Sequence, residues 1–197
     1  MPIEAFFLGA LFIATMSFTP GPANLSLLSV GASLGLSRAM PYVLGIWAGG
    51  LFVIISGALG LGALFLAWPD LFLAMKLFGF AYICWLAWKL ARAGFGASAY
   101  TRPPSFWAGF ALHPVNPKAY VQNMMVFSAF IVPGYSYEVQ ATLLVLASLV
   151  AMVVATVLWG LGGDAIRRFV SDLRTMRFIA VGAAVLMVVS VAAAFLF

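Results

Sequence analysis

Long apolar stretches fill this chain of 197 residues, and short segments between them hold most of its charged residues. A helix needs about 20 mainly apolar residues to cross a bilayer. The pattern therefore predicts an all-α integral membrane protein with six transmembrane helices, at about residues 3–33, 40–66, 71–92, 106–132, 139–163 and 176–196. Hydrophobic residues make up 65% of the chain and charged residues 8%, too little polar surface for a soluble protein. We expect a single transmembrane domain over residues 1–197, embedded in a lipid bilayer.

Two of these spans contain helix-breaking residues. The first holds Pro20, Gly21 and Pro22, and the fourth holds Asn116 and Pro117. Proline lacks a backbone donor and clashes with the preceding turn, so helices 1 and 4 should each be broken into two pieces. Non-helical backbone at membrane depth persists where protein or a watery cavity satisfies its polar groups. The alternative is a pair of ordinary proline kinks.

Basic residues distinguish the two sides of the membrane. Eight Lys and Arg residues fall at the first, third and fifth connections or in the adjoining ends of the spans, and they are Arg38, Lys89, Arg92, Arg102, Arg167, Arg168, Arg174 and Arg177. The other two connections carry only Asp70 and Glu138. The positive-inside rule then places the odd connections in the cytoplasm and both termini outside. The net charge of +5 is thus a topology signal, and no nucleic-acid partner is expected.

Glu4 and the absence of a basic residue before the first apolar run distinguish this segment from a signal peptide, so we expect a retained span.

Three spans in each half make the second half begin on the opposite side from the first. This predicts two inverted three-helix repeats, at about residues 1–95 and 104–197. Pro22 precedes Arg38 by sixteen residues, and Lys118 follows Arg102 by sixteen, so both breaks should lie at one depth and share one site.

Lys118 is the strongest candidate for a functional side chain. A lysine near the bilayer centre is unfavourable unless it faces a cavity or a partner, although a long side chain can also extend to the interface. The helical pieces that begin after Pro20-Gly21-Pro22 and at Pro117 expose backbone N–H groups, whose positive end suits a substrate carboxylate.

Amide side chains near both breaks could bind a carboxylate and an ammonium group, or could simply link helices. They are Asn24, Asn116, Gln122 and Asn123.

Four side chains are candidates for proton coupling: Lys118, Asp164, His113 and Lys76. Asp164 could instead be the ion-pair partner of Arg167 or Arg168. His113 could instead hydrogen-bond a carbonyl freed by the kink, and Lys76 could extend to the outer surface.

Composition argues against several other chemistries. Cys84 and a single histidine cannot build a transition-metal site, and one thiol cannot run a dithiol electron shuttle within one chain. No nucleophile with a base and an orienting partner is apparent, so we expect neither a cofactor nor an enzyme. Gly45, Gly49, Gly57 and Gly60 predict a small-residue face for close helix contact, and such faces permit a homodimer without requiring one.

Several motifs together resemble a known family. They are Thr19-Pro20-Gly21-Pro22, Gly35-Leu36-Ser37-Arg38, Gly45-Ile46-Trp47-Ala48-Gly49, Lys76 with Gly79 and Tyr82, Trp85-Leu86-Ala87-Trp88-Lys89, and Asn116-Pro117-Lys118-Ala119. They resemble the LysE/RhtB amino-acid exporters over residues 8–130, and the last two spans do so only in hydropathy. Residues 81–89 and 106–112 look most like the cysteine and O-acetylserine exporter branch. Members often have a hydrophobic residue where His113-Pro114 stands here.

The resemblance implies a small carrier of the bacterial inner membrane that exports an amino acid or a derivative, usually by exchange with protons. The expected partners are then the amino-acid substrate and protons. Lys118 and the starts of the half-helices would bind the carboxylate, and Asn24, Asn116 and Gln122 the amino group. Two other classes remain open. A non-transporting assembly or scaffold subunit would show no flux, and a passive channel would build no gradient.

Overall fold

The structure is a computed structural model that describes residues 1–93 and 104–193. Within these ranges the chain is all-helical, with no β-strand. Parts of three predicted features lie outside the described residues. They are Arg102, residues 94–95 of the expected first repeat, and residues 194–197 at the end of the expected second repeat and last span.

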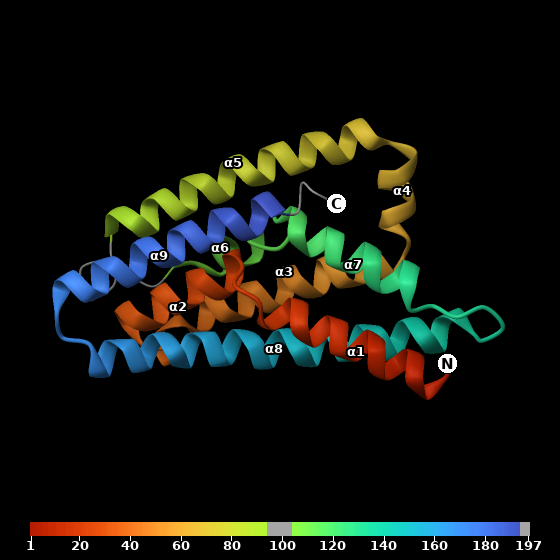
Figure 1. Cartoon of the computed structure of the whole chain (residues 1–197), viewed down its shortest axis with the longest axis horizontal. Helices are drawn as coiled ribbons and strands as arrows, with labels where there is room; N and C mark the ends of the chain where they lie inside the picture. The colour runs from red at the N-terminus through yellow and green to blue at the C-terminus, as the bar shows by residue number, and fades with distance from the viewer. Residues whose placement is uncertain (94–103, 194–197) are drawn as a thin grey trace.

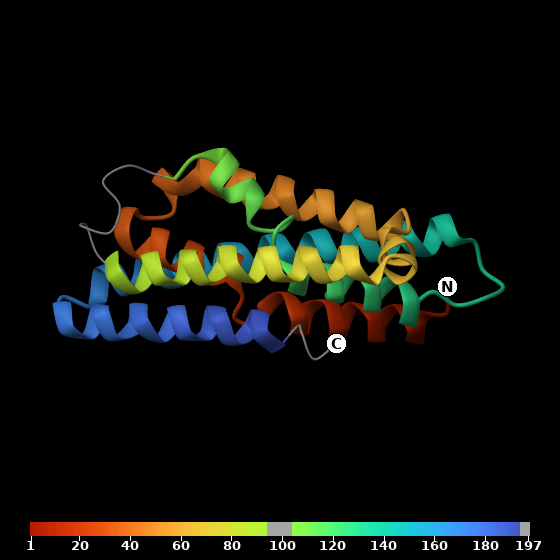
Figure 2. The same ribbon diagram turned by 90° about the horizontal axis from the view of Figure 1, so that it is seen from above.

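The described helices form an elongated bundle in which most helices run along the long axis (Figures 1 and 2). In chain order they are α1 (Ile3–Phe18), α2 (Pro22–Leu34), the short 3-10 helix η1 (Ser37–Ala39), α3 (Met40–Ala58), α4 (Leu61–Ala67), α5 (Pro69–Ala93), α6 (Phe106–Ala111), α7 (Pro117–Ala129), α8 (Tyr137–Phe169) and α9 (Leu173–Ala192). The exception is α4, which turns across one end of the bundle.

Both breaks expected from the prolines are present. α1 and α2 are bent by 47° across residues 19–21, and residues 112–116 separate α6 from α7. Pro22 and Pro117 each occupy the first position of a new helix, where the missing N–H leaves no backbone bond unmade.

Two span boundaries differ from expectation. The expected second span, 40–66, ends early, because α3 stops at Ala58 and Gly60 adopts a left-handed conformation with a φ of 91° before α4 begins. A Cβ on Gly60 would meet nothing within 4 Å, so its expected role in close helix contact is wrong. The expected fifth span, 139–163, is too short, since α8 runs unbroken over 33 residues.

Among the described residues, four helices are long and apolar enough to cross a membrane, and the bent pair α1 and α2 would be a fifth crossing. The four are Ser37–Ala58, Pro69–Arg92, Tyr137–Phe169 and Arg174–Ala192. α6 and α7, which occupy the expected fourth span, have 6 and 13 residues, and each is too short to cross by itself. The protein is therefore a multi-pass, all-helical membrane protein.

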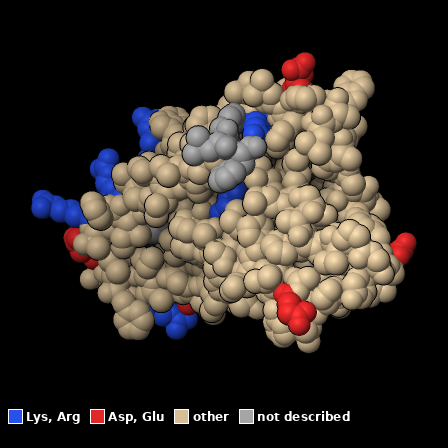
Figure 3. Space-filling model, turned by 45° about the vertical axis from the view of Figure 1, so that its right-hand side comes forward, with Lys and Arg blue, Asp and Glu red and all other residues tan. Residues whose placement is uncertain are grey.

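Charge divides the two ends of the bundle. Basic residues of the described connections lie after α2, in the last turns of α5 and α8 and in the first turns of α9, and these helix ends lie together in Figures 1 and 2. Glu4, Asp70 and Glu138 lie in the first turns of α1, α5 and α8, toward the other end. Figure 3 shows Lys and Arg gathered mostly on its left-hand side.

The first and second halves of the chain are interleaved. α1 and α2 pack mainly on α8, which belongs to the second half, while α3 packs mainly on α6 and α7. α5 and α9 pack against each other, and α3 also contacts α8. The most extensive contacts of each half are therefore made with the other half.

Glycines bring the backbones of α2 and α8 together. A Cβ on Gly31 would lie 2.4 Å from the carbonyl oxygen of Gly160, and a Cβ on Gly163 would lie 2.1 Å from that of Leu28. No side chain fits at such distances, so this crossing depends on small residues, as in many membrane helix pairs.

The crossing of α3 and α6 is built in the same way. Cβ atoms on Gly45 and Gly49 would lie 2.0 and 2.1 Å from the carbonyl oxygens of Phe106 and Phe110. These two glycines make the close helix contact expected of them from the sequence. The two crossings hold α2 and α6 in place, and each of these helices adjoins one break.

Candidate functional site

A cavity of about 70 Å³ lies between the two breaks. Residues of α1, α2, α3, α7 and α8 line it together with residues of both breaks. A cavity of this size has room for several water molecules. The structure thus brings the two helix interruptions to one polar space inside the bundle.

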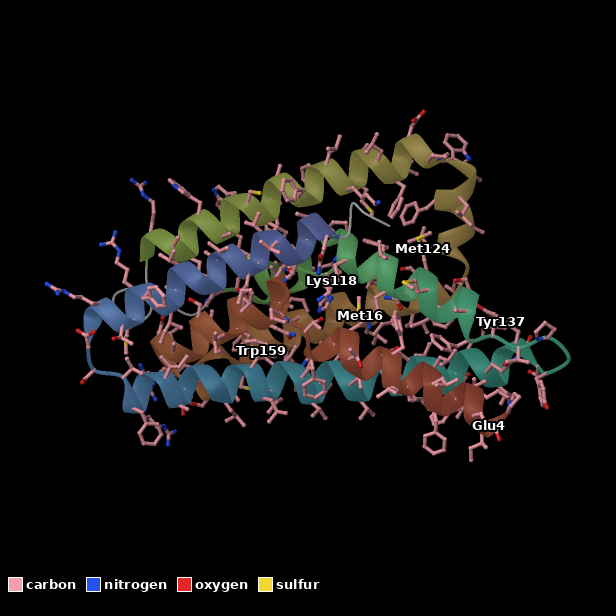
Figure 4. All side chains as sticks on the ribbon, viewed as in Figure 1. Glu4, Met16, Lys118, Met124, Tyr137 and Trp159 are labelled. Atoms are coloured by element: carbon pink, nitrogen blue, oxygen red, sulfur yellow. The ribbon has the colours of Figure 1, made fainter. Side chains whose placement is uncertain are left out.

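Lys118, on the second break, contacts the first. Its Nζ donates hydrogen bonds to Thr19 Oγ1 at 2.8 Å and to the Pro20 carbonyl oxygen at 3.3 Å. Figure 4 shows Lys118 near the middle of the bundle, away from the end marked by Glu4 and Tyr137. Among the described residues, no carboxylate forms an ion pair with this ammonium group. Its present acceptors are therefore neutral oxygens.

The start of α2 faces the same ammonium group. Gly21 is the N-cap residue, and no side chain caps the helix. A Cβ on Gly21 would lie only 3.4 Å from Lys118 Nζ. The first N–H groups of a helix have no partner within the helix and carry partial positive charge. Two sources of positive potential therefore meet beside the cavity.

The start of α7 is capped more completely. Asn116 Oδ1 accepts a hydrogen bond from the Lys118 backbone N–H at 3.2 Å. The Tyr120 hydroxyl donates to the Pro114 carbonyl oxygen at 3.0 Å and so satisfies a carbonyl of the break. These bonds fix the backbone that carries Lys118.

The other predicted amides divide into two groups. Asn24 Nδ2 donates to the carbonyl oxygens of Ser17 and Thr19, at 2.8 and 3.1 Å, so it satisfies carbonyls next to the first break. Asn123 Nδ2 donates to the Ala119 carbonyl oxygen in its own helix at 2.7 Å. Gln122 also lines the cavity, and its side chain makes no hydrogen bond with any described residue. Gln122 is therefore the amide best able to accept a ligand.

Asp164 does not line the cavity. It lies near the end of α8, where its Oδ1 is 2.8 Å from Arg167 Nη2 and its Oδ2 is 2.5 Å from Arg168 Nη2. The structure thus shows the ion pairs that were the alternative to a proton-carrying role.

Lys76 also lies outside the cavity lining. It is 8% exposed, with its Nζ 4.6 Å from the centre of the Phe72 ring. The alternative that Lys76 extends to the outer surface is wrong, because its side chain is buried and lies against the Phe72 ring of its own helix. Phe65 stacks on Phe72 there and contacts Tyr120 edge to face.

His113 lines the cavity, and its buried Nε2 has no hydrogen-bond partner among the described residues. The expected bond from this side chain to a freed carbonyl is therefore not formed. Tyr120 fills that role instead, as described above.

Residues of α8 that line the cavity had no motif to mark them. Ser148, Met152 and Thr156 follow one another at intervals of four and therefore share one face of α8. Trp47 Nε1 donates to Thr156 Oγ1 at 2.9 Å and links α3 to this face. Two hydroxyl residues on one stripe of a very apolar helix are the signal that could have identified it.

Apolar membrane-spanning helices, a broken span and an internal cavity with polar lining are together typical of a membrane transporter. Residues 14–197 match the LysE type translocator family, a range that includes the last two spans. The cysteine/O-acetylserine efflux protein of Escherichia coli O1:K1 / APEC is 32% identical over 155 residues, which cover 77% of this chain and 78% of that protein. The protein of the same name from Escherichia coli strain K12 is 31% identical over the same shares. No solved structure gives a significant match.

The chain belongs to the LysE type translocator family. The family assignment confirms the predicted amino-acid exporter, and it confirms that the chain is a transporter and not an enzyme. It also extends the resemblance seen in the first four spans to nearly the whole chain.

Proposed function

We propose that the protein is a secondary transporter of the bacterial inner membrane that exports cysteine, O-acetylserine or a similarly small neutral amino acid. The names of the related efflux proteins support this substrate class. The observation that carries the proposal is the cavity at which Lys118 and the start of α2 meet. Among the described residues that line it, none is acidic. A substrate carboxylate is the charge that such a site attracts.

The binding geometry follows from the hydrogen bonds already present. A carboxylate would replace Thr19 Oγ1 and the Pro20 carbonyl oxygen as the acceptor for Lys118 Nζ, because charge-assisted bonds are stronger than bonds to neutral oxygens. The N–H groups at the start of α2 would share that carboxylate. Gln122 and Asn116 line the same cavity and would bind the amino group.

The remaining predicted site residues would shape this pocket. Pro20, Gly21, Pro22 and Pro117 create the two helix starts, and Asn24 holds the carbonyls of the first break. Asn123 lines the cavity one turn below Ala119 and would contact the substrate only after releasing its bond to that carbonyl.

We also propose six crossings arranged as two inverted repeats, at about residues 1–95 and 104–197, within one transmembrane domain. α6 and α7 together would form the sixth crossing. The pairing of helices supports this arrangement. The contact of α1 and α2 with α8 corresponds to that of α6 and α7 with α3, and α5 pairs with its expected counterpart α9.

The side of the membrane follows from charge. The described basic residues of the connections gather at one end of the bundle, which would be cytoplasmic. Both termini would then face outward. A reporter fused after Phe197 should be active outside the cytoplasm, and strong cytoplasmic activity would contradict the six-crossing topology.

Alternating access would not divide the protein into its two sequence halves. The glycine crossings join α2 to α8 and α3 to α6 with little room between backbones. These pairs would stay intact as two moving units, one made of α1, α2 and α8 and the other of α3, α6 and α7. The cavity lies between the two units, so their relative motion would open it to one side at a time.

Exchange with protons would need a group besides Lys118. A lysine that is protonated with substrate and neutral on its return would carry protons in the same direction as the substrate. Antiport therefore requires a second titrating group, for which His113, Asp164 and Lys76 are the candidates. His113 is the one of these three that lines the cavity.

Transport by the purified protein in lipid vesicles tests the function. All common amino acids and O-acetylserine should be screened with and without an imposed pH gradient. Saturable, gradient-driven movement of small neutral amino acids is expected. A lack of flux for every substrate would favour a scaffold, and flux without saturation or accumulation would favour a channel.

A further inference from the structure

His113 lines the cavity and carries a buried polar atom that is unsatisfied. Its Nε2 is buried and has no hydrogen-bond partner among the described residues. An imidazole nitrogen that is buried without a partner is unfavourable, because it gives up its bonds to water and gains none. An unsatisfied buried group in a protein calls for an explanation, and in a transporter a polar group of the substrate is a candidate partner.

The neighbours of His113 form a small, adaptable pocket. A Cβ on Gly50 would lie 2.1 Å from Met152 Sδ and 3.3 Å from His113 Cδ2, so the thioether and the imidazole both occupy the space left by the glycine. Cδ2 is bonded to Nε2, so the unsatisfied nitrogen lies beside this space. Methionine is flexible and polarizable, and its side chain can move aside for a ligand group of similar size.

Two groups of contacts can be distinguished within the one cavity. Lys118 Nζ lies beside Gly21 and Thr19 and belongs to the group of atoms that suits a carboxylate. The second group consists of Gly50, Met152 and His113, and it offers one hydrogen-bonding atom in an otherwise apolar setting. A small polar side chain has this character: one hydroxyl, thiol or ester group attached to a short hydrocarbon stem.

We infer that His113 determines specificity by hydrogen-bonding the polar group of the substrate side chain through Nε2, in the space that Gly50 leaves and Met152 now fills. This inference rests on the proposed function and refines its substrate class. A thiol or hydroxyl donates to Nε2, and an ester carbonyl accepts from it if the proton resides on that nitrogen. An apolar side chain of equal size leaves Nε2 unpaired, so the site discriminates against it.

Competition within a single vesicle preparation tests the inference. Cysteine and 2-aminobutyrate have nearly the same shape, but a methyl group replaces the thiol in the second. The wild-type protein should prefer cysteine by about tenfold, the factor that one hydrogen bond supplies. His113→Leu should bring the ratio close to one, measured as amino-acid exchange across the vesicle membrane without a pH gradient, so that loss of a proton-coupling group does not affect the comparison. His113→Gln, which retains hydrogen-bonding groups, should keep most of the preference.

The ratio is independent of the amount of folded protein, so it separates recognition from folding. An unchanged ratio in His113→Leu would overturn the inference. An equal loss for both amino acids would also overturn it, since a residue that binds the common amino group or only supports the fold would act in this way. Absence of all amino-acid transport by the wild-type protein would instead contradict the proposed function.

Discussion

The two breaks do the same structural task with different residues. The first, at residues 19–21, is short, and its new helix begins at Pro22 after Gly21, which provides no side-chain cap. The second, at residues 112–116, is longer, and Asn116 caps the helix that follows. The first break contributes backbone N–H groups, whereas the second contributes an ammonium group on Lys118, which reaches across to Thr19 and Pro20.

This difference shows how two related interruptions can form one asymmetric site. Two copies of the first break would give weak positive potential from helix ends alone. Lys118 adds a full positive charge at the second break. Because its ammonium group donates hydrogen bonds to Thr19 and Pro20, this charge also lies beside the first break. A carboxylate bound there would touch α2 of one proposed moving unit and Lys118 on α7 of the other, so binding would influence how the two units move.

The largest expected effect comes from removing the charge that distinguishes the second break. Lys118→Met keeps a long side chain but removes the ammonium group, so substrate affinity should fall about 100-fold, as expected for a lost charge-assisted bond. Binding to the purified variant and export from vesicles would measure this. Lys89→Met is a matched control, because Lys89 is exposed at the basic end. Wild-type affinity in Lys118→Met would exclude the lysine from binding.

The helix crossings beside the two breaks provide the second comparison. Gly163→Ala and Gly49→Ala each place a Cβ about 2.1 Å from a carbonyl oxygen, those of Leu28 and Phe110. Each should lower the free energy of unfolding by roughly 1–3 kcal/mol, the usual range for overpacking. Thermal unfolding in detergent would record it. Gly182→Ala is the control, since its Cβ would meet nothing within 4 Å.

Equal destabilisation at the two crossings would fit two corresponding units. A lower free energy of unfolding in Gly163→Ala with no change in Gly49→Ala would show that α6 can move away from α3 at little cost. The glycine contact would then not hold the second unit together.

Much of the fold could be predicted from local patterns. The apolar stretches, the prolines of both breaks and the grouping of basic residues are all visible along the chain. The end of α3 could not be placed, because a single left-handed glycine, Gly60, decides it within an unbroken apolar run. The length of α8 was underestimated because its last turns contain Asp164 and two arginines that form ion pairs with it.

The candidate site was predicted only where it coincides with the breaks. Lys118 and the helix starts stood out because polar groups and prolines are unfavourable in a membrane. Thr19 as an acceptor, and Ser148 and Met152 as lining, depend on contacts between residues more than ninety positions apart or between helices with no motif. The burial of Lys76 could not be predicted for the same reason, because the Phe72 ring beside it packs on Phe65 of α4, which in turn contacts Tyr120 of α7.

The cap of the second break allows a test of charge with the backbone unchanged. Asn116→Asp keeps an oxygen that can accept from the Lys118 N–H, but it adds a carboxylate at the cavity. This carboxylate would compete with the substrate for Lys118, so affinity should fall about tenfold. Asn116→Ser also caps a helix and adds no charge, and it should bind nearly as the wild type does. Equal effects of both variants, measured by substrate titration, would show that capping geometry is what matters.

The smallest effect is expected from the neutral acceptor on the first break. Thr19→Val removes the hydroxyl that accepts from Lys118 Nζ at 2.8 Å and keeps the branched shape, leaving the Pro20 carbonyl oxygen at 3.3 Å. In the variant without substrate, the ammonium group keeps only the longer hydrogen bond to Pro20, so substrate binding has less interaction to replace. A carboxylate should therefore bind about threefold more tightly, within the net range of one hydrogen bond. Thr19→Ser retains the hydroxyl and should match the wild type. Substrate titration of the purified variants would decide. Weaker binding by Thr19→Val would mean that the hydroxyl positions Lys118 for the substrate and does not compete with it, and the first break would then take part in binding through a side chain as well as through its backbone.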